Sequence, residues 1–351
     1  MKVGVLTFHK CVNYGSYWQA RCLVDGLRRR GFEAELLDHD CVCVRRAEAR
    51  CALQPKLPER SPRAELRSYG AKTRKFADAI AALPQSRTFS LHEPQGAPAY
   101  DAIVVGSDEV WNFRHPWYGS KPIFFGDGLN TERLVSYAAS FGNHRAWDGI
   151  HPLWAGKLNR FDAISVRDEN SRHLVRNGTD REPTVVLDPC LQFADAIEAQ
   201  PVDRDPYALV YGHGLPRWLA RSARRWSSRA GVRLVSIGYS NDWADEQVID
   251  AGPDDFASLV AGARAVITNF FHGCVFALVN AKPWVTVPSD YRAIKIPDLA
   301  LMLGAERRLV NRQTPEREVH ELLETPVTPA VAERIAAHRE RSATFLDEAL
   351  F

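Results

Sequence analysis

The stretch ITNFFHGCVFA, Ile267–Ala277, gives the clearest indication of the fold. An apolar strand from Ala265 to Ile267 runs into a polar turn, and apolar residues at helical spacing follow His272 and Gly273. We therefore expect a parallel strand to end here and a helix to begin. A histidine at such a strand end, beside the open N–H groups of a helix start, can move a proton next to a bound anion. Gly273 would let a ligand approach the backbone. The alternative is a histidine that only caps the helix.

Short β-rich runs alternate with helical stretches on both sides of this segment. This alternation predicts parallel sheets covered by helices, which is an α/β fold. The stretch from Ala194 to Pro206 is acidic and contains prolines, so it indicates a linker. We expect an N-terminal Rossmann-like domain over residues 1–195 and a C-terminal Rossmann-like domain over residues 206–328. A helix over residues 329–351 is expected to pack across both domains. Two Rossmann-like parallel-sheet domains joined in this way predict a glycosyltransferase-B-like arrangement.

The composition limits the class of protein. The chain has 351 residues, 45% of them hydrophobic, which is enough to bury a large core. Its 45 Lys and Arg residues nearly balance 43 Asp and Glu residues, which argues against a nucleic-acid-binding protein held by bulk charge. The amino terminus does not have the pattern of a signal peptide, and no apolar run approaches membrane-spanning length. We expect a soluble cytoplasmic protein. The oligomeric state is not indicated.

The chain has seven cysteines, and Cys41, Cys43 and Cys51 lie close together in sequence. A zinc site is one interpretation of that grouping. However, there is no C-x-x-C pair, and the odd total argues against a secreted disulfide framework. We expect reduced, mostly structural thiols, no metal site and no cofactor.

Polar residues follow the first predicted strand, Val3 to Phe8. In the segment Thr7–Ser16, Gly15 permits a tight turn, Ser16 can cap the next helix, and the helix start offers N–H donors to an anion or a hydroxyl-rich ligand. The segment is not a G-x-G-x-x-G fingerprint, so a nicotinamide cofactor has no support. An ordinary strand-to-helix loop is the alternative.

Two further strand ends are polar. After the strand Ala102 to Val105, the segment Gly106–Asn112 carries a hydroxyl, two carboxylates, an indole and an amide. These groups predict a sugar-binding edge on which Trp111 stacks against a ring face, although Asp108 has the alternative of capping the next helix. Arg167 emerges directly from the strand Ala163 to Val166, where a guanidinium can grip a carboxylate or phosphate. Its alternative is a salt bridge to Asp168, Glu169 or another local acid.

Five of these segments occur in a characteristic order, namely Asn13–Gly15, Val105–Asn112, Ser165–Asp168, Leu187–Pro189 and Phe271–Gly273. Together they resemble the polysaccharide pyruvyl transferase family. The resemblance extends from Lys2 to about Val310, and the second and last segments are its most specific parts. It implies a fold similar to glycosyltransferase-B enzymes. It also implies transfer of pyruvate from phosphoenolpyruvate onto two sugar hydroxyls of a polysaccharide or its precursor, as a cyclic ketal.

The resemblance gives roles to individual residues. His272 is assigned as general acid/base, because an imidazole can both donate and accept a proton near neutral pH. The expected donor-binding residues are Arg167, Asn269, Gly273, Arg292 and Lys295. The expected acceptor-binding residues are Asn13, Tyr14, Gly15, Gln19, Ser107, Asp108 and Trp111.

The sequence departs from the family pattern at one position. Many members carry a basic residue two positions before the motif histidine, whereas this chain has Phe270 there. We therefore expect the donor's charge to be held by other cations, with Arg167, Arg292 and Lys295 as candidates. No segment specifies the acceptor sugar. A lipid-linked acceptor would bring the enzyme to the inner membrane surface without a spanning helix.

Two other functions fit the same residues. A nucleotide-sugar-dependent glycosyltransferase of this fold would bind a nucleotide diphosphate rather than phosphoenolpyruvate. A catalytically silent sugar- or partner-binding protein would keep the scaffold without the chemistry. His272 and the polar strand ends argue against the silent protein.

Overall fold

The computed structural model describes all 351 residues. The chain forms two compact units, each discontinuous in sequence. Unit 1 comprises Met1–Glu48, Ile80–Ala196 and Ile335–Phe351, and unit 2 comprises Ala49–Ala79 and Ile197–Arg334. Residues 49–79 are thus part of unit 2, although the sequence on both sides of them belongs to unit 1. The carboxyl-terminal segment Ile335–Phe351 is part of unit 1, although it follows unit 2 in sequence.

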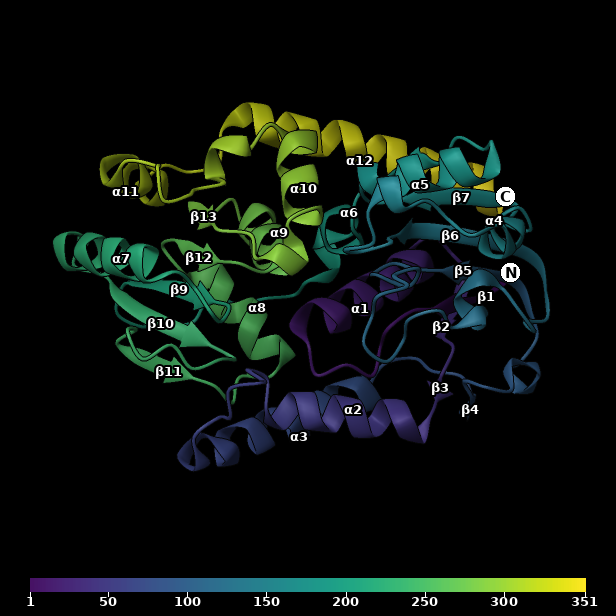
Figure 1. The fold of residues 1–351 in the computed structure, drawn as a ribbon, viewed down its shortest axis with the longest axis horizontal. Helices are drawn as coiled ribbons and strands as arrows, with labels where there is room; N and C mark the ends of the chain where they lie inside the picture. The colour runs from purple at the N-terminus through teal and green to yellow at the C-terminus, as the bar shows by residue number, and fades with distance from the viewer. The chain divides into compact units, whose positions relative to one another are not determined.

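Unit 1 is built on a six-stranded sheet in which all neighbouring strands are parallel (Figure 1). In sheet order these strands are β2 (Glu33–Leu36), β1 (Lys2–Leu6), β5 (Tyr100–Val105), β6 (Thr131–Ala139), β7 (Ala163–Val166) and β8 (Thr184–Val185). Residues 102–105 of the inner strand β5 are all fully buried, as expected for a parallel sheet covered on both faces. The helices of this unit are α1 (Tyr14–Arg29), α4 (Pro152–Leu158), α5 (Glu169–Thr179) and α6 (Pro189–Gln192).

A second, two-stranded sheet of unit 1 pairs β3 (His39–Asp40) with β4 (Phe89–Ser90), again in parallel. Between these strands in sequence lie α2 (Val42–Leu53) and α3 (Leu66–Ala81), which span most of residues 49–79. The last helix, α12 (Pro329–Leu350), begins in unit 2 and ends in unit 1. Short 3-10 helices are η1 (Arg63–Glu65), η2 (Pro94–Gly96), η3 (Pro122–Phe125), η4 (Ala146–Asp148), η5 (Ala194–Ala196), η6 (Asp290–Arg292) and η7 (Glu306–Arg308).

Unit 2 has a five-stranded parallel sheet (Figure 1). In sheet order its strands are β11 (Glu246–Val248), β10 (Arg233–Ile237), β9 (Tyr207–Tyr211), β12 (Val266–Thr268) and β13 (Trp284–Thr286). Its helices are α7 (Arg217–Ala230), α8 (Pro253–Gly262), α9 (Phe271–Val279), α10 (Lys295–Leu303) and α11 (Glu316–Glu324). Ala208 and Val210 share one core with residues of α7 and α11. Helices α8 and α9 pack together through Phe256 and Phe276, whose ring centroids are 4.9 Å apart.

The strand register of unit 2 brings three strand ends into line. Thr268 at the end of β12 pairs with Tyr211 at the end of β9, and Val210 of β9 pairs with Ser236 of β10. Because all strands run the same way, the residues that follow β9, β10 and β12 emerge side by side at one edge. Ligands bind at this edge of open parallel sheets.

One expectation about the cysteines is wrong. Cys41 and Cys43 are joined by a disulfide, with their Cα atoms 5.4 Å apart, which is within the range that a disulfide can bridge. The other five cysteines are not disulfide-bonded.

Candidate active site

The carboxyl edge of the unit 2 sheet carries a cluster of aromatic side chains. Three adjacent strands are each followed, two residues after their end, by an aromatic residue: His213 after β9, Tyr239 after β10 and Phe270 after β12. Their ring centroids are 5.2 Å apart for His213 and Tyr239, 5.5 Å for His213 and Phe270, and 5.2 Å for Tyr239 and Phe270. Tyr211, the last residue of β9, lies 4.8 Å from Phe270. These four residues are called the strand-end aromatic cluster below.

Two cations lie on the faces of this cluster. Cζ of Arg292 is 4.0 Å from the centroid of the Phe270 ring, and the guanidinium also donates to Oγ of Ser289 at 3.1 Å. Nζ of Lys72 is 4.6 Å from the centroid of the Tyr239 ring and donates to the Gly238 carbonyl oxygen at 3.1 Å. Cations on aromatic faces give this edge a positive potential, which favours an anionic ligand.

The helix pattern explains why Lys72 is buried. Tyr69, Lys72 and Phe76 follow one another at three- and four-residue spacing, so they share one face of α3, and all three are buried. Lys72 retains only 3% of its accessible surface. Burial lowers the pKa of the Lys72 ammonium from 10.5 to about 7. Its charge therefore changes close to neutral pH.

His213 is held in its neutral form. Burial lowers the pKa of its imidazole from 6.5 to about 4, and the nearby charges of Arg292, Lys56 and Lys72 act in the same direction. A neutral imidazole at pH 7 can donate or accept a hydrogen bond, but it adds no positive charge to the edge. The positive charge of the cluster comes from Arg292 and Lys72.

His272 lies in the first turn of α9, two residues after Phe270. It is buried, with 8% of its surface exposed, and its ring packs edge-on against Phe271 at 5.1 Å. The α9 start has no side-chain cap, and Phe270 occupies the N-cap position. His272 therefore does not cap the helix.

Asn269 and Gly273 act in local packing. Asn269 donates from Nδ2 to the His213 carbonyl oxygen at 2.8 Å, which fixes the turn that follows β9. A Cβ atom on Gly273 would lie 2.1 Å from Oγ1 of Thr268, so the side chain of Thr268 fills the space beside the glycine. The glycine therefore permits α9 to pack on β12, and the approach of a ligand to its backbone stays a prediction.

Lys295 is the first residue of α10 and is buried. Its Nζ lies 5.5 Å from the centroid of the Tyr291 ring. Of the three cations expected to hold the donor, Arg292 is the one that lies on Phe270, two residues before His272.

Arg167 forms an ion-paired centre within unit 1. Its Nη2 is 3.3 Å from Oδ1 of Asp108, and its Nη1 is 3.1 Å from Oδ2 of Asp188. Burial opposes the charge, but these carboxylates raise the pKa of the Arg167 guanidinium above its usual value. Asp168 instead caps α5 by accepting from the N–H of Ser171 at 2.7 Å. Arg167 is thus held in salt bridges, but with distant acids rather than with Asp168, Glu169 or another local acid. An anion would have to compete with two carboxylates.

The other polar residues of unit 1 form one hydrogen-bond network. Ser107 Oγ donates to Gln19 Oε1 at 2.6 Å, and Gln19 Nε2 donates to the Ser16 carbonyl oxygen at 2.8 Å. Ser16 Oγ donates to Oδ2 of Asp108 at 2.8 Å. Asn13 Oδ1 caps α1 by accepting from the N–H groups of Gly15 at 2.8 Å and Ser16 at 3.2 Å. The structure thus brings Asn13, Gln19, Ser107 and Asp108 together, and much of their hydrogen-bonding capacity is used internally.

Trp111 does not offer a face to a sugar. Its side chain is 1% exposed, and its Nε1 donates to the Phe124 carbonyl oxygen at 2.8 Å. Its ring packs against Phe125, Phe141 and Phe161. A stacking platform needs an open ring face, so the expected role of Trp111 is corrected to that of a core residue. Tyr14 is also fully buried, and Asn13 is the only one of the seven expected acceptor residues that is not buried.

A charged group that the sequence did not reveal lies at the ends of β1 and β2. Nε2 of His9 is 3.1 Å from Oδ1 of Asp38, and Lys10 forms an ion pair with the same carboxylate. Although burial opposes it, hydrogen bonds from His9, Lys10 and Thr88 hold the pKa of Asp38 well below its usual range. His9 and Lys10 could have been selected from their position after the first strand, whereas Asp38 gives no local signal.

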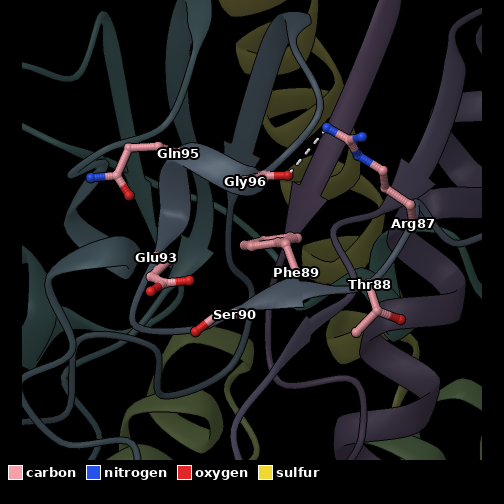
Figure 2. Close-up of a pocket in the computed structure, with 7 residues that line it drawn as sticks. All are labelled: Arg87, Thr88, Phe89, Ser90, Glu93, Gln95 and Gly96. Carbon is pink, nitrogen blue, oxygen red and sulfur yellow. Dashed lines mark hydrogen bonds between the residues drawn. The ribbon is translucent and has the colours of Figure 1, made fainter.

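Unit 1 also has a shallow pocket beside β4, at a distance in sequence from all predicted site residues. Figure 2 shows its lining, in which the Arg87 guanidinium donates to the Gly96 carbonyl oxygen at 3.4 Å. The lining residues are Arg87, Thr88, Phe89, Ser90, Glu93, Gln95 and Gly96. Arg87 and Glu93 supply opposite charges, and no expected catalytic group is present.

The fold is similar to solved structures of UDP-GlcNAc 2-epimerases. The enzyme from Neisseria meningitidis bound to UDP-GlcNAc matches with a TM-score of 0.52 and 10% identity, covering 99% of this chain and 100% of that chain. The enzyme from Methanocaldococcus jannaschii matches with a TM-score of 0.53 and 11% identity, again covering 99% and 100%. At these identities the likeness concerns the fold alone. It confirms the predicted α/β class with Rossmann-like parallel sheets of the glycosyltransferase-B type. No curated protein matches the sequence.

None of the helices combines the length and the apolar composition that a membrane span requires. The family model described as polysaccharide pyruvyl transferase matches residues 13–291. That range begins at the cap of α1 and includes the ion-paired centre of unit 1, the strand-end aromatic cluster and His272. The chain therefore belongs to the polysaccharide pyruvyl transferase family and is a transferase.

Proposed function

We propose that this transferase moves pyruvate from phosphoenolpyruvate onto two hydroxyls of a saccharide. The product is a cyclic ketal, and inorganic phosphate is released. In this proposal unit 2 binds the donor, unit 1 supplies acceptor-binding groups, and His272 is the general acid/base. The family supports pyruvyl transfer, and the positive edge of the unit 2 sheet supports an anionic donor.

The chemistry follows from the enol group of phosphoenolpyruvate. Protonation of the methylene carbon forms the methyl group and leaves positive charge at C2, which one acceptor hydroxyl attacks with loss of its proton. Phosphate then leaves, and the second hydroxyl closes the ketal with loss of its proton. One side chain that gives and takes protons serves these steps, and we assign this role to the imidazole of His272.

The contact between Arg292 and Phe270 carries the donor assignment. Many family members have a basic residue at the position of Phe270, two residues before the histidine. In this chain the guanidinium of Arg292 lies 4.0 Å from the centroid of the Phe270 ring. A cation from the segment that follows β13 therefore lies next to this position. A guanidinium can bind a carboxylate or phosphate through two parallel hydrogen bonds.

Lys72 adds a second cation to the donor edge. Because burial lowers its pKa to about 7, the ammonium form is only partly populated at neutral pH. A bound anion favours the charged form, so donor binding should take up a proton at Lys72 when the pH is near or above 7. A buried lysine of this kind is common at functional sites.

The acceptor is proposed to be a saccharide. Asn13 is the least buried of the expected acceptor residues, and the carboxylates and hydroxyls behind it are held by the network around Ser107. A lipid-linked saccharide is one acceptor class within this proposal. It would place the enzyme at the inner face of the membrane by way of its substrate.

A phosphate-release assay tests the proposal. The purified chain is incubated with phosphoenolpyruvate and a panel of free and lipid-linked saccharides, and the product is checked by mass spectrometry for the mass of a pyruvate ketal. We expect phosphate release that depends on one acceptor class and is lost in His272→Gln. Release of a nucleoside diphosphate from a nucleotide sugar, without phosphate release from phosphoenolpyruvate, would instead identify a glycosyltransferase and reject the proposal.

A further inference from the structure

The small sheet of unit 1 brings two separate segments to one edge. Strands β3 and β4 are parallel, with His39 opposite Phe89 and Asp40 opposite Ser90. The pairing continues beyond the strands, since the N–H of Leu91 donates to the Asp40 carbonyl oxygen at 2.8 Å. The residues that follow the two strands, Cys41 and His92, therefore leave the sheet at the same edge.

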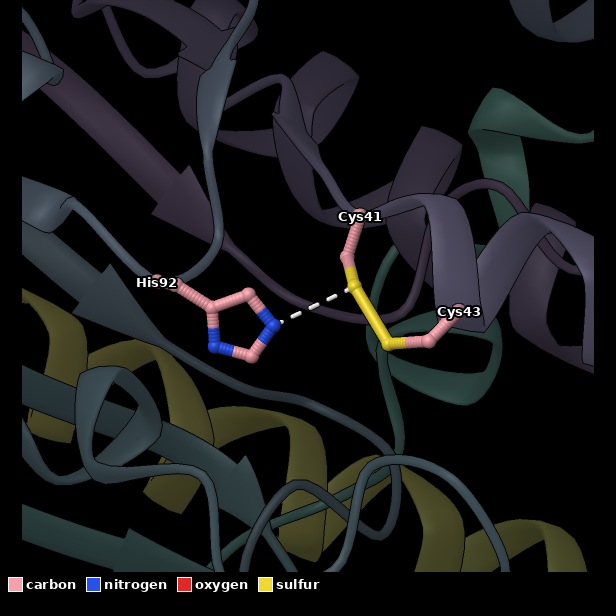
Figure 3. A group of neighbouring side chains, drawn as sticks. All are labelled: Cys41, Cys43 and His92. Carbon is pink, nitrogen blue, oxygen red and sulfur yellow. Dashed lines mark hydrogen bonds between the residues drawn. A yellow bond between two sulfur atoms is a disulfide. The ribbon is translucent and has the colours of Figure 1, made fainter.

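The side chains of Cys41, Cys43 and His92 meet there, as Figure 3 shows, and all three are of types that can bind a metal ion. Nε2 of His92 is 3.2 Å from Sγ of Cys41, and Sγ of Cys41 is bonded to Sγ of Cys43. The three ligand atoms all lie within 4.8 Å of one another. Cys43 and His92 are exposed, and Cys41 is the least exposed of the three.

We propose that Cys41, Cys43 and His92 form a site for Zn²⁺ that opens when their disulfide is reduced. Zinc binds thiolate sulfur at about 2.3 Å and histidine nitrogen at about 2.0–2.1 Å in tetrahedral geometry, so two of its ligands lie roughly 3.5–3.8 Å apart. The distance of 3.2 Å between Cys41 and His92 is close to that separation. Small side-chain rotations would bring all three donors onto one ion, and the exposed side of the group would leave the fourth position to water.

Reduction is the step that creates the ligands. Two electrons and two protons from a dithiol reductant convert the disulfide into two thiols, and the reductant becomes a disulfide. Zn²⁺ then binds both sulfurs as thiolates with release of their protons, while His92 binds through a neutral ring nitrogen. Oxidation removes two of the three ligands at once, so the site is present only in a reducing environment.

The proposal does not depend on pyruvyl transfer, because none of the three residues belongs to the expected donor or acceptor set. A titration tests it directly. The full chain is reduced with a phosphine, freed of reductant under argon and titrated with Zn²⁺ against a chromophoric chelator. We expect one Zn²⁺ per reduced chain and no binding by the oxidised chain. With Co²⁺ as probe, a near-ultraviolet band from thiolate ligation should appear.

Substitutions distinguish the residues that bind Zn²⁺ from neighbouring residues that do not. The double variant Cys41→Ser/Cys43→Ser should abolish Zn²⁺ binding. His92→Gln, at an exposed position, should weaken Zn²⁺ binding at least tenfold, because mutating even the residues that hydrogen-bond to metal ligands lowers metal affinity roughly 10–100-fold. Cys51→Ser, which removes an exposed thiol outside the group, should bind as the wild type does. Circular dichroism checks that each variant is folded. Equal binding by the double serine variant, by His92→Gln or by the oxidised chain would overturn the proposal, as would the absence of binding by the reduced chain.

Discussion

At the scale of single residues, His272 and His213 are two imidazoles of one unit with different expected roles. His213 is neutral at pH 7 because its pKa is about 4, so it suits binding rather than proton donation. We expect His272→Gln to lower kcat by about a hundredfold or more, the usual contribution of general acid–base catalysis, with little change in the thermal midpoint. His213→Gln should change KM more than kcat. Steady-state kinetics of both variants at pH 7 decide the assignment. Equal kcat losses, or full activity of folded His272→Gln, would contradict it.

A substitution of Arg292 tests the binding of the donor at the scale of a single residue. Removing a charge-assisted hydrogen bond costs roughly 1.5–3 kcal/mol, so Arg292→Ala should weaken phosphoenolpyruvate binding by more than tenfold. Lys295→Ala should have a smaller effect, because Lys295 contacts Tyr291 rather than Phe270. Calorimetric titration measures both, with Arg224→Ala on the exposed face of α7 as control. Normal donor affinity in Arg292→Ala would remove the main support for the donor assignment.

At the scale of elements, the contact of α9 with β12 depends on Gly273. A methyl group there would meet Thr268 Oγ1 at 2.1 Å, and this hydroxyl already donates to the Tyr211 carbonyl oxygen at 2.6 Å. We expect Gly273→Ala to cost about 1–3 kcal/mol of unfolding free energy, as overpacking usually does. Gly156→Ala in α4 is the control, since no atom lies within 4 Å of its added Cβ and alanine favours a helix. Denaturant unfolding compares the two. A neutral Gly273→Ala would show that Thr268 can move aside.

Helix α3 retains a buried lysine at a cost to stability. The pKa of Lys72 falls from 10.5 in the unfolded chain to about 7 in the folded one, so between pH 7 and 10.5 the unfolded state binds more protons. Stability should therefore rise with pH across this window, by at most about 1.4 kcal/mol per pH unit, and the cost of the buried charge is largest below pH 7.

We expect Lys72→Met to be more stable than the wild type at pH 7, with a gap that closes toward pH 10. Urea unfolding at several pH values measures this gap. Lys75→Met is the matched control, because Lys75 lies on the exposed side of the same helix and pairs with Asp255 at 2.7 Å. If Lys72→Met and Lys75→Met respond to pH alike, Lys72 does not titrate near 7.

The element scale also shows what the sequence could predict. Strands, helices and their order follow from local periodicity, which is why Arg167 and His272 fall next to the ends of parallel strands as expected. Contacts between residues far apart in sequence cannot be derived from local periodicity. Arg167 pairs with Asp108 and Asp188, which are 59 and 21 residues away, whereas the sequence suggests only Asp168, Glu169 or another local acid.

The strand-end aromatic cluster and its cation could be predicted from the sequence only in part. His213 and Tyr239 each come two residues after a short apolar run that forms a strand, β9 or β10, so their position at a strand end can be recognised in the sequence. Lys72 was detectable as a lysine in the apolar stripe of a helix, but nothing local shows that it reaches Gly238, 166 residues away. For Trp111, an indole after a strand end is compatible with either a bound sugar or the hydrophobic core. Only the ring contacts of the folded chain distinguish the two.

At the scale of the whole molecule, unit 1 is completed by residues from the other end of the chain. Residues Ile335–Phe351 belong to it, although unit 2 accounts for the preceding stretch from Ile197 to Arg334. Ser342 Oγ accepts from the N–H of Leu187 at 2.9 Å, Arg339 Nε donates to the Leu191 carbonyl oxygen at 2.7 Å, and Asp347 forms an ion pair with Arg30. Leu346 and Leu350 of this segment are almost fully buried.

A chain that ends at Arg334 should therefore lose the stability of unit 1. Removing the segment uncovers the apolar surface of unit 1 on which Leu346 and Leu350 are buried. It also leaves buried backbone groups such as the Leu187 N–H without their partners, each costing about 1–3 kcal/mol. We expect early proteolytic cleavage within residues 80–196 of the truncated chain. The milder variant Ser342→Ala removes the acceptor of the Leu187 N–H and the bond that the hydroxyl donates to the His338 carbonyl oxygen. It should lower the unfolding free energy by roughly 1–3 kcal/mol without new cleavage. Limited proteolysis with mass spectrometry locates the cuts. A truncated chain with wild-type resistance in residues 80–196 would show that unit 1 folds without its carboxyl-terminal segment.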